Sequence, residues 1–314
     1  MIQGNRSPDV LEKLRLLRSE LGHRPLDSKS RVWYSSLLLG LTRSLEDTRA
    51  AAFHARVAAE LAPVTFPVVE LAALVLARTG DRQEAAALVR QAFEFDPTAA
   101  ADLLLKLESD LGETVTGQAL AEDPRAWVAW GRALFDAGRP EESQAVLVEA
   151  AAHWRDDLEL LVILSRRAAS SADWDALDRW TNHVDPIPVE GHGVELLAYR
   201  ALLHAERMEP ARAEADLGSV LSVAGMAPHV LVIVGDVQDR LGSIETARKS
   251  WNRALFRIPP ERSFERIEVL VRLAKLEESD GRASVALRHW RAVIELDPTH
   301  AAARARIRAL TGGS

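Results

Sequence analysis

The strongest constraint on this chain is a set of small residues, tryptophans and prolines that returns at a fixed offset near the C-terminal end. In each copy a glycine is followed by an alanine, a tryptophan, a second apolar residue and a proline at constant spacing, and the second copy lies 39 residues after the first. The two sets are Gly242, Ala247, Trp251, Ala254 and Pro259, and Gly281, Ala286, Trp290, Val293 and Pro298. A fixed period of this length predicts a stack of similar structural units.

Earlier parts of the chain carry the same pattern. The upstream landmarks are Ala51, Ala55, Ala58 and Pro63, then Gly80, Ala85, Val89, Ala92 and Pro97, then Trp127, Trp130, Gly131, Leu134 and Gly138. This recurrence resembles the tetratricopeptide family, whose pattern is W-x2-L-G-x2-Y, then A-x3-F, then P over 34 residues. The resemblance covers most of the chain. It implies an all-α fold, a right-handed α-solenoid of antiparallel helical hairpins.

Each recurring residue type has a physical role in such a hairpin. Gly131 and Gly235 on the first helix, and the alanines on the second, are expected to be small because the two helix backbones approach closely there. The glycine between the helices supplies a positive φ that ends the first helix, and the proline ends the second helix because it lacks an amide donor. Trp251 and Trp290 are expected to fill the groove between successive repeats.

The pattern divides the chain into five regions. We expect an N-terminal helix and linker at 1–30, repeats at 31–97, a degenerate short unit at 98–123, further repeats at 124–298, and a C-terminal capping helix and tail at 299–314. The degenerate unit begins with leucines that predict a helix, but two glycines and two threonines then interrupt it. The stack could bend there, and the same region is the expected boundary if the array has two halves.

Composition excludes several classes of function. The formal net charge of −7 argues against sequence-independent binding of nucleic acid, which needs a concentrated positive surface. The chain has no cysteine, so disulfides and thiolate metal sites are excluded. Its apolar runs are far shorter than the roughly 20 residues that span a bilayer, so no direct membrane insertion is expected. The excess of arginine over lysine, with the high alanine content, suggests a GC-rich bacterial genome.

No catalytic or cofactor motif stands out. The sequence has no G-x-x-x-x-G-K loop for phosphates, no H-E-x-x-H metal motif and no G-x-S-x-G nucleophile motif. Adjacent carboxylates such as Glu141 and Glu142 point in different directions on a helix and are typical of solvated surfaces. We therefore expect no enzyme activity, no cofactor and no metal. Neither the compartment (cytoplasmic or periplasmic) nor the oligomeric state follows from the sequence.

Candidate binding residues lie on the first helix of the central hairpins, which lines the concave face of such a solenoid. Arg132 and Arg166 are separated by one 34-residue period and are expected to stack on one ridge, with Tyr199 one unit further along. This ridge could hold an anionic or extended peptide through charge-assisted hydrogen bonds and stacking. The alternative is a solvated inner face with ordinary charge variety. The predicted partner-binding residues are Arg125, Arg132, Phe135, Asp136, Arg166 and Tyr199.

Three functional hypotheses remain open. The first is a non-catalytic protein-interaction scaffold that binds a segment of a protein or peptide partner in its concave groove. The second is the soluble tail of a bacterial envelope or polysaccharide-export assembly, as in tetratricopeptide regions that resemble this one. The third is a regulatory module that closes around a small peptide.

Overall fold

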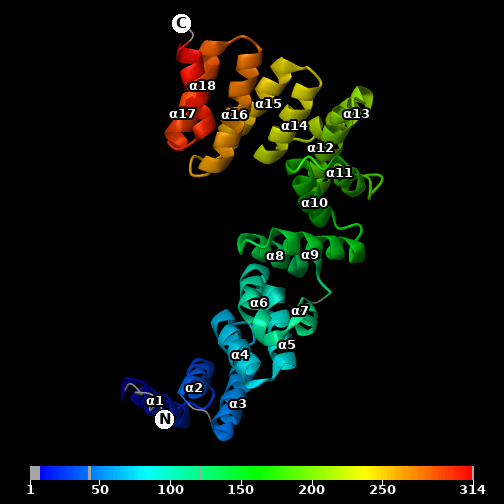
Figure 1. The fold of residues 1–314 in the computed structure, drawn as a ribbon. Coiled ribbons are helices and arrows are strands. Elements are labelled where there is room, and N and C mark those ends of the chain that lie inside the picture. Colours follow the sequence, from blue (N-terminus) through cyan, green and yellow to red (C-terminus); the bar gives the residue numbers. More distant parts are fainter. Residues whose placement is uncertain (1–7, 42–43, 121, 313–314) are drawn as a thin grey trace. The chain divides into compact units, whose positions relative to one another are not determined.

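A computed structural model of the protein describes residues 8–41, 44–120 and 122–312. Within these ranges every regular element is an α-helix, and the helices follow one another in chain order from α1 to α18 (Figure 1). The all-α solenoid predicted from the sequence is confirmed. The chain forms two compact units, unit 1 (Met1–Trp154) and unit 2 (Arg155–Ser314).

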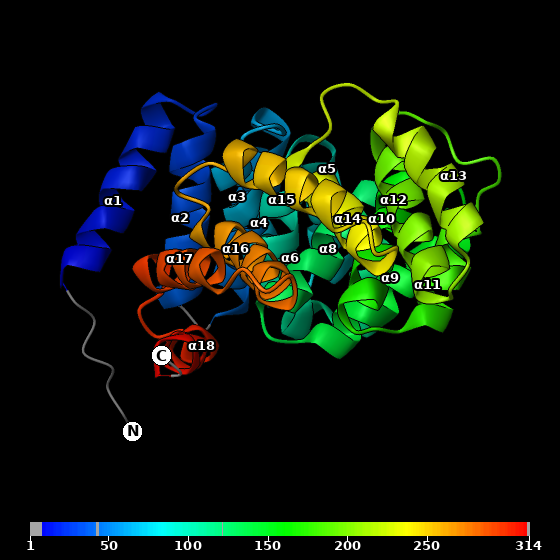
Figure 2. The same cartoon turned by 90° about the horizontal axis from the view of Figure 1, so that it is seen from above.

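In its described residues, unit 1 contains four pairs of antiparallel helices preceded by a single helix. Its elements are α1 (Pro8–His23), α2 (Ser28–Leu41), α3 (Leu45–Leu61), α4 (Phe66–Thr79), α5 (Arg82–Phe95), α6 (Pro97–Leu111), α7 (Glu113–Ala119), α8 (Pro124–Asp136) and α9 (Pro140–His153). Helix α1 packs on α2 at the beginning of the unit (Figure 2). One continuous apolar core extends from Val32 to Leu134.

Unit 2 also contains four hairpins and ends with a single helix. Its elements are α10 (Leu158–Ser170), α11 (Trp174–Thr181), α12 (Gly191–Glu206), α13 (Pro210–Leu221), α14 (Pro228–Arg240), α15 (Ile244–Arg257), α16 (Ser263–Ser279), α17 (Ala283–Leu296) and α18 (Ala301–Gly312). The first helices of successive hairpins, α10, α12 and α14, pack against one another, and α18 packs on α17.

The turn residues behave as the sequence predicts. The glycines between paired helices all have positive φ, as shown by Gly80, Gly138, Gly242 and Gly281. In the hairpins α10–α11 and α12–α13 the same position is taken by Ala172 and Met208, which also have positive φ. Helices α5, α15 and α17 end before the expected prolines, since a proline cannot donate the next helical hydrogen bond.

Residues 98–123 are more regular than their sequence suggests. Helix α6 runs without interruption to Leu111, and Gly112, with a φ of 79°, ends it. The partner helix α7 is only 7 residues long, which accounts for the shortness of this unit. The expected boundary between two halves fell in this region, whereas the two compact units divide between Trp154 and Arg155.

The close approach of paired helices explains the glycines on their facing sides. A Cβ built on Gly131 would lie 2.8 Å from Leu147 of α9, and one built on Gly235 would lie 2.4 Å from the Trp251 indole of α15. Trp251 and Trp290 are almost fully buried. Their packing role is as expected. Among the described residues, no helix combines the length and apolar character needed to cross a membrane.

Candidate functional site

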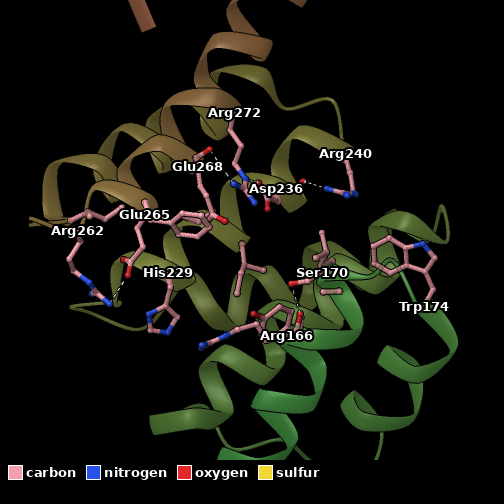
Figure 3. A pocket seen from close by; sticks show the side chains of 17 residues that line it. Arg166, Ser170, Trp174, His229, Asp236, Arg240, Arg262, Glu265, Glu268 and Arg272 are labelled. Atoms are coloured by element: carbon pink, nitrogen blue, oxygen red, sulfur yellow. Dashed lines mark hydrogen bonds and ion pairs between the residues drawn. The ribbon is translucent and has the colours of Figure 1, made fainter. Parts of the chain in front are cut away.

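Unit 2 contains a groove along the first helices of its hairpins. The cavity has a volume of about 570 Å³ and is lined by residues of α10, α12, α14 and α16, together with Trp174 of α11 and residues before α16. Figure 3 shows the charged side chains that surround it. The groove is therefore built from one helix of each hairpin, so that a ligand lying along it would contact several repeats.

Three residues occupy the same position in successive hairpins and line this groove. Arg166, Tyr199 and Asp236 each follow directly after a buried small residue, which is serine, alanine and glycine respectively. The small residue faces the second helix of its hairpin, as the contact of Gly235 with Trp251 shows. The next residue is rotated by about 100° on a helix with 3.6 residues per turn, which carries it towards the groove.

A buried carboxylate holds two basic groups that line the groove. Glu195 of α12 is 5 % exposed. Its Oε1 accepts a hydrogen bond from Arg166 Nη2 at 2.7 Å, and its Oε2 lies 2.8 Å from His229 Nε2. Burial alone favours the neutral acid, but the hydrogen bonds from His229 and Arg166 outweigh it and hold the pKa of Glu195 below its ordinary value. Glu195 thus joins α10, α12 and α14.

A second charged cluster lies around Asp236. Arg272 Nε of α16 donates to Asp236 Oδ1 at 2.8 Å, and Trp251 Nε1 donates to the same oxygen at 3.1 Å. Burial raises the pKa of Asp236 above its ordinary value, and the neighbouring Arg272 opposes this shift. Figure 3 shows Arg272 beside Asp236.

Aromatic and ion-paired side chains complete the groove. Tyr199 is 6 % exposed, and burial raises the pKa of its phenol to about 12, so the hydroxyl stays protonated near neutral pH. Phe264, at the beginning of α16, is 74 % exposed. Arg240 donates to Glu206 at 2.6 Å, and Arg262 pairs with Glu265 at 2.6 Å. The groove therefore offers apolar surface and fixed charges of both signs.

The structure separates the residues predicted from the sequence into two groups. Arg166 and Tyr199 line the groove. Arg125, Arg132, Phe135 and Asp136 lie on α8 in unit 1, where Arg125 pairs with Asp123 at 2.8 Å and the other three are exposed. The predicted ridge of Arg132 and Arg166 therefore has one member in each unit, and the binding role of all six residues stays a prediction.

Several groove residues were missed by the sequence argument. Asp236 directly follows Gly235, which the sequence identifies as a small packing residue. The same rule that places Arg166 and Tyr199 therefore also identifies Asp236 in the next hairpin. His229 and Arg272 have no comparable signal, because their importance depends on contacts with other helices. In the described part of the chain, His, Asp and Glu side chains form no group of three or more that could hold a metal ion.

Known structures resemble the fold, whereas sequence comparisons find no relative. No protein-family model matches the chain, and no curated protein sequence matches it. A tetratricopeptide repeat protein from Parabacteroides merdae aligns with 91 % of this chain and 99 % of its own, with 10 % identity and a TM-score of 0.50. The Cut9–Hcn1 hetero-tetramer of the APC/C aligns over 90 % of this chain with 11 % identity and a TM-score of 0.52.

This chain spans 63 % of the length of the matched chain in the APC/C complex. At these identities the similarity concerns the fold. The tandem hairpins, the turn residues with positive φ and the agreement with solved structures lead to the same assignment. The protein has the tetratricopeptide-repeat fold, an α-solenoid of stacked helical hairpins.

Proposed function

We propose that the protein is a non-catalytic interaction scaffold that binds an extended segment of a partner protein in the groove of unit 2. The observation that carries this proposal is Phe264, a large apolar side chain that is 74 % exposed at a groove lined by four successive inner helices. An aromatic side chain held at a concave surface contributes binding energy when a partner covers it.

The chemistry of the groove also fits a peptide. Leu202, Val232 and Ile233 line the groove together with the charged clusters. Interfaces of this kind combine an apolar centre with polar groups that fix the orientation of the ligand. An extended segment has alternating side chains and free backbone groups that can use both kinds of surface.

A matched pair of phenylalanine variants tests the proposal. Random linear peptides displayed on phage are selected on the intact chain, and the affinity of the selected peptides is measured by isothermal titration calorimetry. Phe264→Ala should weaken binding by about tenfold, the loss expected for a contributing interface aromatic. Phe256 is 91 % exposed on α15 and does not line the groove, so Phe256→Ala should leave the affinity unchanged.

Both positions are exposed, so neither substitution should alter the fold. Equal affinities of the two variants and the original chain would contradict binding at the groove. Failure to select any peptide would contradict the proposal as well, because a peptide-binding groove must retain some sequences from a random collection.

A further inference from the structure

We propose that the segment bound in this groove carries an acidic side chain whose carboxylate is held between Arg166 and His229. The inference rests on the proposed function, and it adds the chemical character of the partner. It follows from the way Glu195 arranges the two basic groups.

Glu195 fixes both groups before any ligand binds. It lies beneath them on α12, whereas Arg166 comes from α10 and His229 from α14, the two helices that flank α12. The carboxylate is almost fully buried, but the side chains of Arg166 and His229 are 53 % and 50 % exposed. A ligand that approaches from the groove therefore meets the two basic groups and not the acid.

Each basic group keeps unused hydrogen-bonding capacity towards the groove. A guanidinium has five N–H donors, and Arg166 uses Nη2 for Glu195 and also hydrogen-bonds to Tyr199, which leaves further donors. The contact of His229 with Glu195 is made by Nε2, which leaves Nδ1. One buried carboxylate is shared by the two basic groups, so a second carboxylate arriving from the groove can accept hydrogen bonds from the remaining donors of Arg166.

The rest of the groove disfavours a polyanion. Asp236, Glu265 and Glu268 also line it, and Arg272 and Arg262 are paired with the first two of these acids. A nucleic acid or a run of phosphates would bring several negative charges against these carboxylates. A single acidic side chain within a peptide brings one negative charge, which Arg166 and His229 can receive, so it meets less repulsion than a polyanion does.

The test compares matched peptides on matched variants of the intact chain. A peptide selected as above is synthesised in two forms, one with its Asp and Glu residues and one with Asn and Gln in their place. Both are titrated against the original chain, Arg166→Gln, His229→Gln and the control Arg253→Gln, which removes one positive charge from an exposed position on α15 outside the groove.

The original chain and Arg253→Gln should bind the acidic form about tenfold more tightly, as expected for charge-assisted hydrogen bonds. Arg166→Gln should remove most of this preference, and His229→Gln part of it. In these two variants the affinity for the neutral form should change less than the affinity for the acidic form, and circular dichroism of each variant checks that the chain remains folded.

Four results would overturn the inference while leaving the proposed function in place. Two are equal affinity for the two peptide forms and an acidic preference that survives both groove variants. The other two are displacement of the peptide by a single-stranded oligonucleotide and tighter binding of a phosphoserine peptide. Failure of Phe264→Ala to weaken either form contradicts the proposed function itself. The two failures can therefore be told apart.

Discussion

The indole Nε1 of Trp251 donates a hydrogen bond to Oδ1 of Asp236, with 3.1 Å between the two atoms. Trp251 belongs to the second helix of its hairpin and is 3 % exposed, whereas Asp236 belongs to the first helix and lines the groove. The same indole also contacts the backbone carbonyl of Val232 at 3.1 Å. A residue that fills the core therefore also orients a charged group at the candidate site.

Replacing Trp251 by Phe should raise the pKa of Asp236 further above its ordinary value. The indole N–H stabilises the charged carboxylate and so lowers the pKa of Asp236. Without it, the effect of burial, which raises this pKa, is opposed by fewer groups. We also expect a loss of about 1 kcal/mol in the free energy of unfolding, the usual net value of one hydrogen bond. Carboxyl NMR during a pH titration measures the first effect. Trp290→Phe is the control, because the Trp290 indole bonds to Glu278 instead, and an equal shift in both variants would contradict the argument.

Gly235→Ala should destabilise unit 2. The added Cβ would lie 2.4 Å from Trp251 Nε1, so the indole or the helix has to move, at a cost of about 1–3 kcal/mol for overpacking. Gly218→Ala is the matched control, since that glycine lies on α13 with no atom within 4 Å of the new Cβ. The control should gain about 0.8 kcal/mol from helix propensity. Urea unfolding measures both values, and equal effects would exclude the proposed contact.

Glu195→Gln should reduce stability near neutral pH by about 2 kcal/mol, because hydrogen bonds to a charged group are lost. The folded-state pKa of Glu195 is lowered from 4.5, so its stabilising contribution is present above pH 4.5 and declines as the pH falls through the folded-state value. The difference between the variant and the original chain should therefore shrink in acid. Urea unfolding at a series of pH values tests this, with exposed Glu214→Gln as the control. A difference that grows in acid would refute it.

Glu277→Ala should weaken the junction between the last two hairpins of unit 2. This carboxylate is 2 % exposed and accepts from Arg248 Nε of α15 at 2.7 Å, while Arg282 Nε lies 2.6 Å from its other oxygen. Removing it takes away one charged hydrogen-bond partner of Arg248, which keeps Asp280 and Glu245, so the expected cost is about 2 kcal/mol. Thermal unfolding followed by circular dichroism measures the loss. The exposed Glu261→Ala should change little, and a similar loss there would contradict a specific role.

The sequence predicts the helical hairpins well because their contacts are local and repeated. Gly131 and Gly235 lie where a large residue of the partner helix occupies the space of a side chain, and the equivalent position before Arg166 and Tyr199 also holds a small residue. The division between Trp154 and Arg155 has no such periodic signal. The irregular composition of 98–123 instead suggested a boundary where the structure has the continuous helix α6.

The candidate site was predicted only in part. Arg166 and Tyr199 follow the repeat register, so counting residues is enough to place them on the inner face. Glu195 has no such signal, because its role depends on its burial and on its contacts with Arg166 and His229 from the flanking helices. Phe264 comes just after the connection that follows Pro259. The period lengthens to 39 residues there, so the repeat register does not predict the position of Phe264.

Arg166, Tyr199 and Asp236 share one position in successive hairpins, and this sets the interval between the partner residues that they could contact. Neighbouring packed helices lie about 8–10 Å apart, while an extended chain advances about 3.3 Å per residue. Successive inner helices would therefore face about every third residue of a segment that lies across them. Partner sequences should show their preferred residue types at intervals of about three, in the order in which α10, α12 and α14 meet them.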